Sequence, residues 1–224
     1  MSKIKAVIWD MDGVIIDTEG YWPQAERAVF TLVGVPAGEN FENTTTGLRI
    51  PDVVRFWYDR YPWDKKLFPL QQLEEKIINS MAKFIKKEGK ALPHIYEAFS
   101  FFHSKGLAQS IASSSPPFLI KSVIKKLKIE LYITSFSSGE EEKLGKPAPD
   151  VYLTAARKLN INPLECLVIE DSHNGALAGH NAGMKVVVVT KNPEQFKDIP
   201  NITVISSLLE ICTGMTAYTK KFSK

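Results

Sequence analysis

The chain has 224 residues, of which 44% are hydrophobic and 24% are charged, and its formal net charge is +3. This balance is typical of an ordinary globular protein and excludes a largely disordered chain. The small positive excess does not indicate a nucleic-acid partner, and no apolar run is long enough to span a membrane. We expect a cytoplasmic protein, because the N-terminal residues lack the apolar stretch and cleavage site of a signal peptide.

Strand and helix patterns alternate along most of the chain. Short apolar runs bounded by turn residues predict strands at residues 6–9, 107–112, 133–136, 167–169 and 186–189. Amphipathic segments between them predict helices at residues 93–105, 117–127, 151–159 and 174–182. Because strands that alternate with helices indicate a parallel sheet covered on both faces, we predict an α/β fold with a Rossmann-like core.

One interval of the chain interrupts this alternation. It contains no strand-like run, and its helical stretches lie at residues 21–32, 51–61 and 69–87. A crossover between parallel strands usually needs about a dozen residues or somewhat more, so the excess predicts an inserted helical domain. We assign residues 18–89 to this insertion and residues 1–17 and 90–224 to the core around the sheet.

Two acidic residues follow the first predicted strand, Asp10 and Asp12, with Gly13 directly after them. In open α/β sheets, ligands bind at the carboxyl ends of the strands. Two carboxylates two residues apart can approach one site, where they repel each other unless a cation neutralises them. Gly13 allows a sharp turn and a close approach of the backbone to a ligand. A simple polar turn is the alternative interpretation.

Two later loops carry polar groups that suit an anionic ligand. Ser113 and Ser114, followed by Ser115, offer hydroxyl and N–H groups that can bind phosphate oxygens. Lys146 precedes Pro147 in a loop that also contains Pro149, and the prolines stiffen the backbone that holds the amine. A polar loop and a surface lysine are the respective alternatives.

A second acidic pair, Glu170 and Asp171, follows the fourth predicted strand. Carboxylates suit a hard divalent cation, whereas Asp171 or Ser172 could instead cap the following helix. For any one loop taken alone, its structural alternative (a turn, a polar loop, a surface lysine or a helix cap) would be an adequate explanation. Four polar loops, each after a strand, together favour one shared site at the carboxyl edge of the sheet.

These residues, in this order, resemble the four motifs of the haloacid dehalogenase superfamily. The first motif is Asp10-x-Asp12-Gly13-Val14-x-x-Asp17, and the others contain Ser113, Lys146 and Glu170-Asp171. The helical insertion after the first motif resembles the superfamily's α-helical cap, and the resemblance covers almost the whole chain. Lys146-Pro147-Ala148-Pro149-Asp150 and Glu170-Asp171-Ser172 are most similar to the group that contains β-phosphoglucomutase and the sugar-phosphate or hexitol-phosphate phosphatases.

The resemblance implies a mechanism based on covalent phosphoryl transfer. It makes Asp10 the nucleophile that forms an aspartyl phosphate, and Asp12 the general acid for the leaving alcohol and then the base for water. It implies Mg²⁺ held by the Asp10 carboxylate, the Asp12 carbonyl and Asp171. Glu170 is either a further ligand of the ion or a residue that contacts the ligands without contacting the ion.

The remaining groups of the implied mechanism hold the phosphate and the substrate. Ser113, Ser114 and Lys146 are expected to bind the transferring group. In the cap, Trp22, Gly47 and Arg49 are the candidates for contact with the substrate. Arg49 stands where the mutase holds a phosphate with arginine, although an exposed arginine at a helix start is the alternative. Asp17 is expected at the hinge into the cap, and Trp57, Tyr58 and Trp63 in the cap's core.

The sequence therefore predicts a Mg²⁺-dependent phosphatase for a small phosphorylated metabolite, such as a sugar or sugar-alcohol phosphate. A phosphosugar mutase is the alternative, but this chain carries Trp22 where the mutase has a histidine. A dehalogenase is disfavoured because the dehalogenases of the superfamily lack the second aspartate of the first motif, and this chain has Asp12 there. A receiver domain that only accepts a phosphoryl group is disfavoured by the order of the acidic pair and by the large insertion. We expect a monomer without nucleic-acid or membrane partners.

Overall fold

One parallel sheet forms the centre of the protein. The computed structural model describes residues 3–18, 20–41 and 44–213. Within these residues, six strands pair in the order β3-β2-β1-β4-β5-β6. They are β1 (Ala6–Trp9), β2 (Ala108–Ser113), β3 (Ser135–Ser138), β4 (Cys166–Glu170), β5 (Lys185–Val189) and β6 (Ile202–Ile205). Since β1 pairs in parallel with both β2 and β4, the predicted α/β fold is confirmed.

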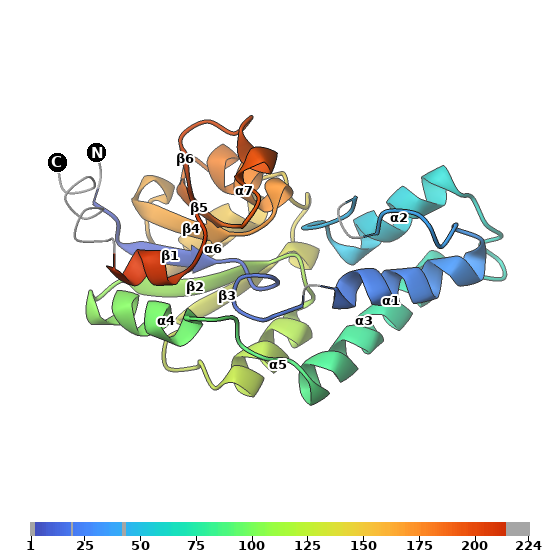
Figure 1. Cartoon of the computed structure of the whole chain (residues 1–224), viewed down its shortest axis with the longest axis horizontal. Helices are drawn as coiled ribbons and strands as arrows, with labels where there is room; N and C mark the ends of the chain where they lie inside the picture. The colour runs from blue at the N-terminus through green and yellow to red at the C-terminus, as the bar shows by residue number, and fades with distance from the viewer. Residues whose placement is uncertain (1–2, 19, 42–43, 214–224) are drawn as a thin grey trace.

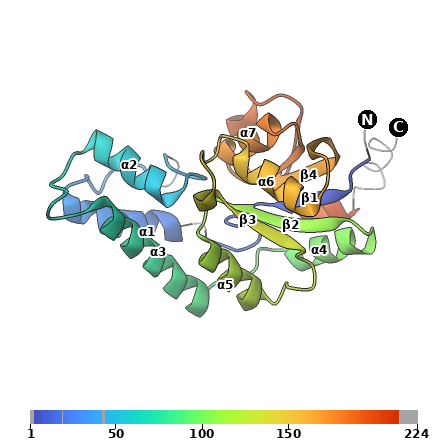
Figure 2. The ribbon, with the colours of Figure 1, turned by 180° about the vertical axis from the view of Figure 1, so that it is seen from behind.

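Helices cover both faces of the sheet (Figures 1 and 2). Helices α4 (Ile95–Ser104) and α5 (Pro117–Leu127) lie on one face, and α6 (Asp150–Leu159) and α7 (His173–Asn181) lie on the other. Successive side chains of a strand point to opposite faces, so Trp9 packs with α4 while Ile8 belongs to the apolar cluster of α6 and α7. The Trp9 ring meets Phe99 edge to face, with 4.8 Å between the ring centroids.

The edges of the sheet differ most from the sequence-based expectations. Strand β3 begins at Ser135, two residues later than predicted, and β6 was not predicted at all. An edge strand is covered less than a central one, so it lacks the continuous apolar run that identifies β5. The pairing of Val186 with Ile202 is a tertiary contact that the local pattern does not encode.

Three further helices lie beside the sheet domain (Figure 1). They are α1 (Tyr21–Phe30), α2 (Ile50–Arg60) and α3 (Leu70–Lys87), with a short 3-10 turn (Thr31–Val33) after α1. Their shared interior is aromatic: Trp57 is fully buried, Trp63 is nearly so, and Tyr58 is half-buried against Trp63. Among the described residues, no helix combines the length and apolar character needed to cross a bilayer.

The chain passes between the two parts of the molecule at two adjacent points. The Asp17 N–H donates to the Lys90 carbonyl at 2.9 Å, and Ile16 forms an antiparallel bridge with Ala91. We propose this crossing as the hinge, which keeps the predicted division into residues 18–89 and the remainder. The Asp17 side chain is exposed, so its contribution here is made by the backbone.

Candidate active site

The amine of Lys146 lies at the centre of the carboxyl edge of the sheet. Its Nζ donates to Asp10 Oδ1 at 2.5 Å and to Glu170 Oε1 at 2.7 Å. It also reaches the Ala112 carbonyl, at 3.5 Å, next to the predicted phosphate-binding Ser113. Lys146, Asp10 and Glu170 are only 3%, 6% and 0% exposed. Three loops far apart in the sequence therefore meet in one buried ion-pair cluster.

Asp171 completes an acidic group around this lysine. Oxygen atoms of Asp10, Glu170 and Asp171 all lie within 4.8 Å of one another. A Cβ atom on Gly13 would lie 1.8 Å from Asp171 Oδ2, and the φ angle of Gly13 is +76°. Only glycine fits this position, because it tolerates that backbone angle and leaves room for the carboxylate. The glycine of the first motif thus allows Asp171 to approach Asp10.

The cluster carries more negative charge than one lysine neutralises. Burial raises the pKa of Asp10 to about 8, with Lys146 opposing this shift and Glu170 and Asp12 adding to it. Burial, followed by the charges of Glu170 and Asp10, raises the pKa of Asp171 well above its ordinary value. Burial lowers the pKa of Lys146, but the charges of Asp10 and Glu170 outweigh it and hold that pKa well above its ordinary range.

These groups fit a bound Mg²⁺. The ion prefers oxygen ligands and commonly binds through one or two carboxylates. Asp10 and Asp171 present carboxylate oxygens side by side, and their raised pKa values show that additional positive charge would stabilise their ionised forms.

Glu170 is held on both of its oxygens by protein donors. Oε1 accepts from Lys146 and from the Tyr152 hydroxyl, the latter at 2.8 Å. Oε2 accepts from the N–H groups of Asp171 and Ser172 at 2.9 and 3.0 Å. Burial raises the pKa of Glu170, but Lys146 and these hydrogen bonds outweigh it and lower the pKa. This geometry favours Glu170 as a support for the site over a direct metal ligand.

The loop after Glu170 also begins a helix. Ser172 is the N-cap of α7, where its Oγ accepts from the Gly175 N–H at 3.1 Å. A Cβ on Gly175, the third residue of α7, would lie 1.6 Å from Glu170 Oε1, so only glycine fits this position of the first turn. The capping alternative and the acidic site are therefore both present in one loop.

Sequence reasoning missed Tyr152, whose hydroxyl donates to Glu170. No local sequence signal beyond its place on α6 marks this residue.

The three consecutive serines that begin with the last residue of β2 make three different contacts. Ser113 is buried, and its Oγ accepts from the Ser115 N–H at 3.0 Å. Ser114, for which phosphate binding stays a prediction, donates to the Gly47 carbonyl of the cap at 2.7 Å. Ser115 donates to Asp12 Oδ2 at 2.9 Å. The sequence identified the cluster, whereas only the structure distinguishes the serine that contacts Asp12.

The cap contributes a donor to Asp12. The indole Nε1 of Trp22, on α1, donates to Asp12 Oδ1 at 2.9 Å. Burial raises the pKa of Asp12, while hydrogen bonds from Trp22, Ser115 and Thr18 oppose the shift. A raised pKa favours the protonated carboxyl that a general acid needs. Trp22 therefore contacts Asp12, the group predicted to transfer protons.

Arg49 and the residues before it join the cap to the core. The Arg49 guanidinium pairs with Asp52 through two contacts of 2.6 and 3.0 Å. It also donates to the carbonyls of Gly139 and Glu142 in the core, at 3.3 and 3.0 Å. Gly47 has a φ angle of +82°, and its carbonyl accepts from Ser114. The structure thus places both predicted substrate residues at the cap–core contact.

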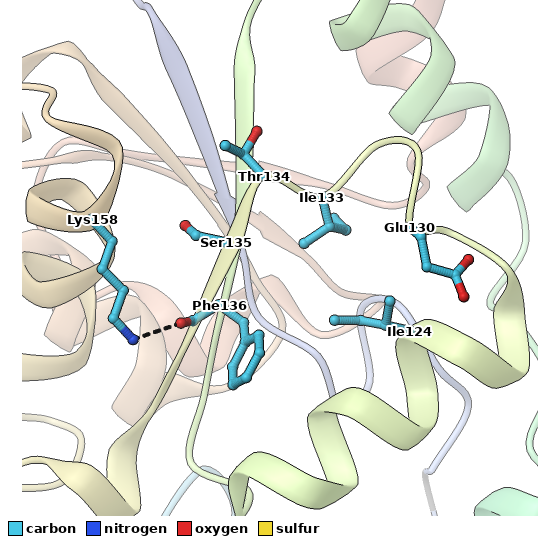
Figure 3. A pocket seen from close by; sticks show the side chains of 7 residues that line it. All are labelled: Ile124, Glu130, Ile133, Thr134, Ser135, Phe136 and Lys158. Carbon is cyan, nitrogen blue, oxygen red and sulfur yellow. Dashed lines mark hydrogen bonds between the residues drawn. The ribbon is translucent and has the colours of Figure 1, made fainter.

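A separate groove lies beside the edge strand β3, as Figure 3 shows. Ile124, Ile133 and Phe136 form much of its apolar lining, and Lys158 Nζ donates to the Phe136 carbonyl at 2.7 Å. None of its lining residues belongs to the buried cluster around Lys146. We therefore locate the candidate active site at the carboxyl edge and not in this groove.

Known proteins share both the sequence and the architecture of this chain. Residues 4–183 match the family model of haloacid dehalogenase-like hydrolases. The chain is 35% identical to hexitol phosphatase B of Escherichia coli (strain K12) over 216 residues, which cover 96% of each protein. It is 28% identical to a phosphorylated carbohydrates phosphatase of Thermotoga maritima, over 81% of this chain and 83% of the relative.

A solved structure supports the same assignment. The β-phosphoglucomutase of Clostridium difficile superposes with a TM-score of 0.82 and 26% sequence identity, and the match covers 98% of this chain and 96% of that one. The family model covers well over half of the chain, and the relative in Escherichia coli spans nearly all of it. The chain therefore belongs to the haloacid dehalogenase-like hydrolase family and is an enzyme of the phosphatase type that the sequence predicts.

Proposed function

We propose that this enzyme is a Mg²⁺-dependent phosphatase that hydrolyses a sugar or sugar-alcohol phosphate through an aspartyl phosphate on Asp10. The buried meeting of Asp10, Lys146 and Asp171 at one sheet edge is the observation that carries this proposal. The printed names of the relatives, which include hexitol and carbohydrate phosphatases, support the substrate class.

The first chemical step transfers the phosphoryl group to the enzyme. A carboxylate oxygen of Asp10 forms a bond to phosphorus as the bond from phosphorus to the alcohol oxygen breaks. Asp12 donates its proton to that oxygen, so the substrate leaves as a neutral alcohol. Lys146 places a fixed positive charge beside the transferring group, and Ser113 and the loop amides offer hydrogen bonds to its oxygens.

The second step regenerates the enzyme. Water attacks the phosphorus of the aspartyl phosphate, Asp12 accepts a proton from the water, and the bond to the Asp10 oxygen breaks to release inorganic phosphate. Mg²⁺, when held by the Asp10 carboxylate, the Asp12 carbonyl and Asp171, supplies positive charge that offsets the phosphate oxygens. Glu170 orients Lys146 and the Asp171 backbone by accepting a hydrogen bond from the Lys146 amine and one from the Asp171 N–H.

Removal of the metal tests the proposed function directly. After treatment with EDTA, we expect release of phosphate from hexitol and hexose phosphates to fall to background, and we expect added Mg²⁺ to restore it. The reason is that the crowded carboxylates then lack their neutralising cation. A panel of phosphorylated metabolites, assayed for inorganic phosphate, gives the measurement. Full activity in the presence of the chelator would contradict the proposal.

A phosphosugar mutase remains the second candidate, because the β-phosphoglucomutase structure matches so much of the chain. The Trp22 indole can donate a hydrogen bond but cannot accept a proton at pH 7. We therefore favour hydrolysis. Phosphorus NMR with β-glucose 1-phosphate and glucose 1,6-bisphosphate separates the two, since a mutase converts the sugar phosphate to its isomer and a phosphatase produces inorganic phosphate.

Substitution of Trp22 tests the contact between cap and general acid. We expect Trp22→Phe to lower kcat by about fivefold, because Asp12 loses one orienting hydrogen bond worth about 1 kcal/mol. Trp22→Tyr is the matched control, since it keeps an aromatic side chain with a hydrogen-bond donor, and we expect it to retain more activity. Steady-state phosphate release gives both values. Equal losses in the two variants would show that the hydrogen bond is not the important feature.

A further inference from the structure

A buried carboxyl in the cap has no place in the mechanism described above. Glu26 lies on α1 and is 5% exposed, on a helix face whose other buried members are Ala25, Val29 and Phe30. Its Oε2 accepts a hydrogen bond from Thr45 Oγ1 at 3.0 Å, and Thr45 is only 3% exposed. This contact joins α1 to the segment of the cap that precedes α2.

Burying the Glu26 carboxyl in this environment costs free energy of folding, because the carboxyl loses its contact with water. Burial raises its pKa to about 7, while Thr45 and Trp57 oppose the shift. Within the described chain, the Trp57 indole N–H makes no hydrogen bond of normal geometry. An apolar side chain of similar volume would avoid the cost of desolvating a carboxyl. Stability of the cap alone therefore does not account for a glutamate here.

The segment that Glu26 holds makes direct contacts with the core. It comprises residues 45–49, and we call it the docking segment. The Thr46 carbonyl accepts from Asn174 Nδ2 at 2.9 Å, and the Gly47 carbonyl accepts from Ser114. Arg49 reaches core carbonyls, as described above. The Leu48 N–H closes the turn by donating to the Thr45 carbonyl at 3.1 Å.

Helix α1 makes its own contact with the core, through Trp22. Residues four apart in a helix lie on the same face, so Glu26 is one turn beyond Trp22 on the same face of α1. Trp22 contacts Asp12, and Glu26 holds Thr45 at the start of the docking segment. The cap also contacts the core through α3, where the Lys86 carbonyl accepts from Lys126 Nζ at 2.8 Å. Trp22 and the docking segment are the two cap stretches that reach the active-site side of the core, and the contact between Glu26 and Thr45 connects them.

We propose that Glu26 is a positioning residue that fixes the docking segment to α1, so that Trp22 and this segment meet the core and its substrate as one unit. This inference rests on the proposed function, because it assigns Glu26 to substrate selection by the same site. A substrate large enough to contact the cap depends on this unit. A very small phosphate donor, such as acetyl phosphate, contacts the core groups and depends on it little.

Three variants test the proposal. Glu26→Leu removes the acceptor at similar volume, Thr45→Val removes the donor at similar volume, and Glu26→Gln keeps an oxygen that can accept from Thr45. We expect the first two to raise KM for a hexitol phosphate about tenfold, which corresponds to one lost hydrogen bond, with kcat/KM for acetyl phosphate within about threefold. We expect Glu26→Gln to keep the wild-type KM. We expect the KM of the double variant Glu26→Leu/Thr45→Val to be no higher than that of either single variant.

Hydrogen exchange gives a readout that needs no catalysis. In the Asp10→Asn background, we expect the Leu48 amide to exchange about tenfold faster in Glu26→Leu than in Glu26→Gln, because the docking segment has lost its anchor. If wild-type protein hydrolyses neither phosphate, the proposed function fails while the exchange result still tests Glu26. Equal losses for both substrates, together with unchanged exchange at Leu48, would overturn the positioning role.

Discussion

Asp10→Asn is expected to lower the hydrolysis of any phosphorylated substrate by on the order of 10⁴-fold or more. An amide is not a nucleophile toward phosphorus, so the variant cannot form the covalent intermediate. The structure shows why the effect should be chemical and not structural. Asparagine has nearly the same shape as aspartate and keeps an oxygen that can accept from Lys146, which lies 2.5 Å from Asp10 Oδ1.

Two measurements check this result. Phosphate release in the steady state gives the rate, and acid quenching with a labelled substrate detects the aspartyl phosphate in wild-type protein and its absence in the variant. Asp17→Asn is the matched control, because it makes the same chemical change at an exposed aspartate of the hinge. We expect Asp17→Asn to remain within about twofold of wild type. Substantial turnover by Asp10→Asn would refute the covalent mechanism.

Lys146→Met is the second change with a large expected effect. It leaves the buried carboxylates of Asp10 and Glu170 without their shared cation. Removing one partner of a buried ion pair typically costs about 3–5 kcal/mol of stability, and we expect a loss of this size in the absence of Mg²⁺. We also expect kcat/KM to fall about 10³-fold, because a fixed positive charge beside the transferring group is lost.

Urea unfolding with and without Mg²⁺ measures the stability change. Because a bound cation would neutralise Asp10, one of the two carboxylates that Lys146 pairs with, we expect Mg²⁺ to restore part of the lost stability in Lys146→Met. Lys158→Met is the control, since Lys158 is exposed and donates only to the Phe136 carbonyl in the groove of Figure 3. We expect its unfolding free energy to change by about 0.5 kcal/mol or less. A similar change in both variants would contradict the assigned role of Lys146.

The contacts of Asp12 show how the cap adds to the chemistry of the core. Trp22 and Ser115 occupy both oxygens of its carboxyl, one from each side of the cap–core boundary. Opening of the cap would remove the Trp22 contact and leave the Ser115 contact in place. The position of the cap therefore affects the group that we expect to transfer protons, in addition to its expected role in selecting the substrate.

The sequence by itself determined the architecture of the sheet and the positions of the polar loops. Continuous apolar runs such as that of β5 must be buried on both faces, and this requirement fixes a parallel sheet with helices on each side. Once the strands are known, Asp10, Ser113 and Glu170 are placed at strand ends by their position alone. The pattern was weaker at the edge of the sheet, where β6 is partly exposed and was missed.

Only the tertiary structure decided which side chains meet within that framework. Tyr152 reaches Glu170 from another helix, and Arg49 reaches core carbonyls about 90 residues away in sequence. The assignment of Ser115, and not Ser114, to Asp12 depends on the direction of each side chain in the folded loop. Burial patterns constrain which face of an element is covered, but the direction of a polar side chain is set by packing between segments that are distant in the chain, which no local pattern records.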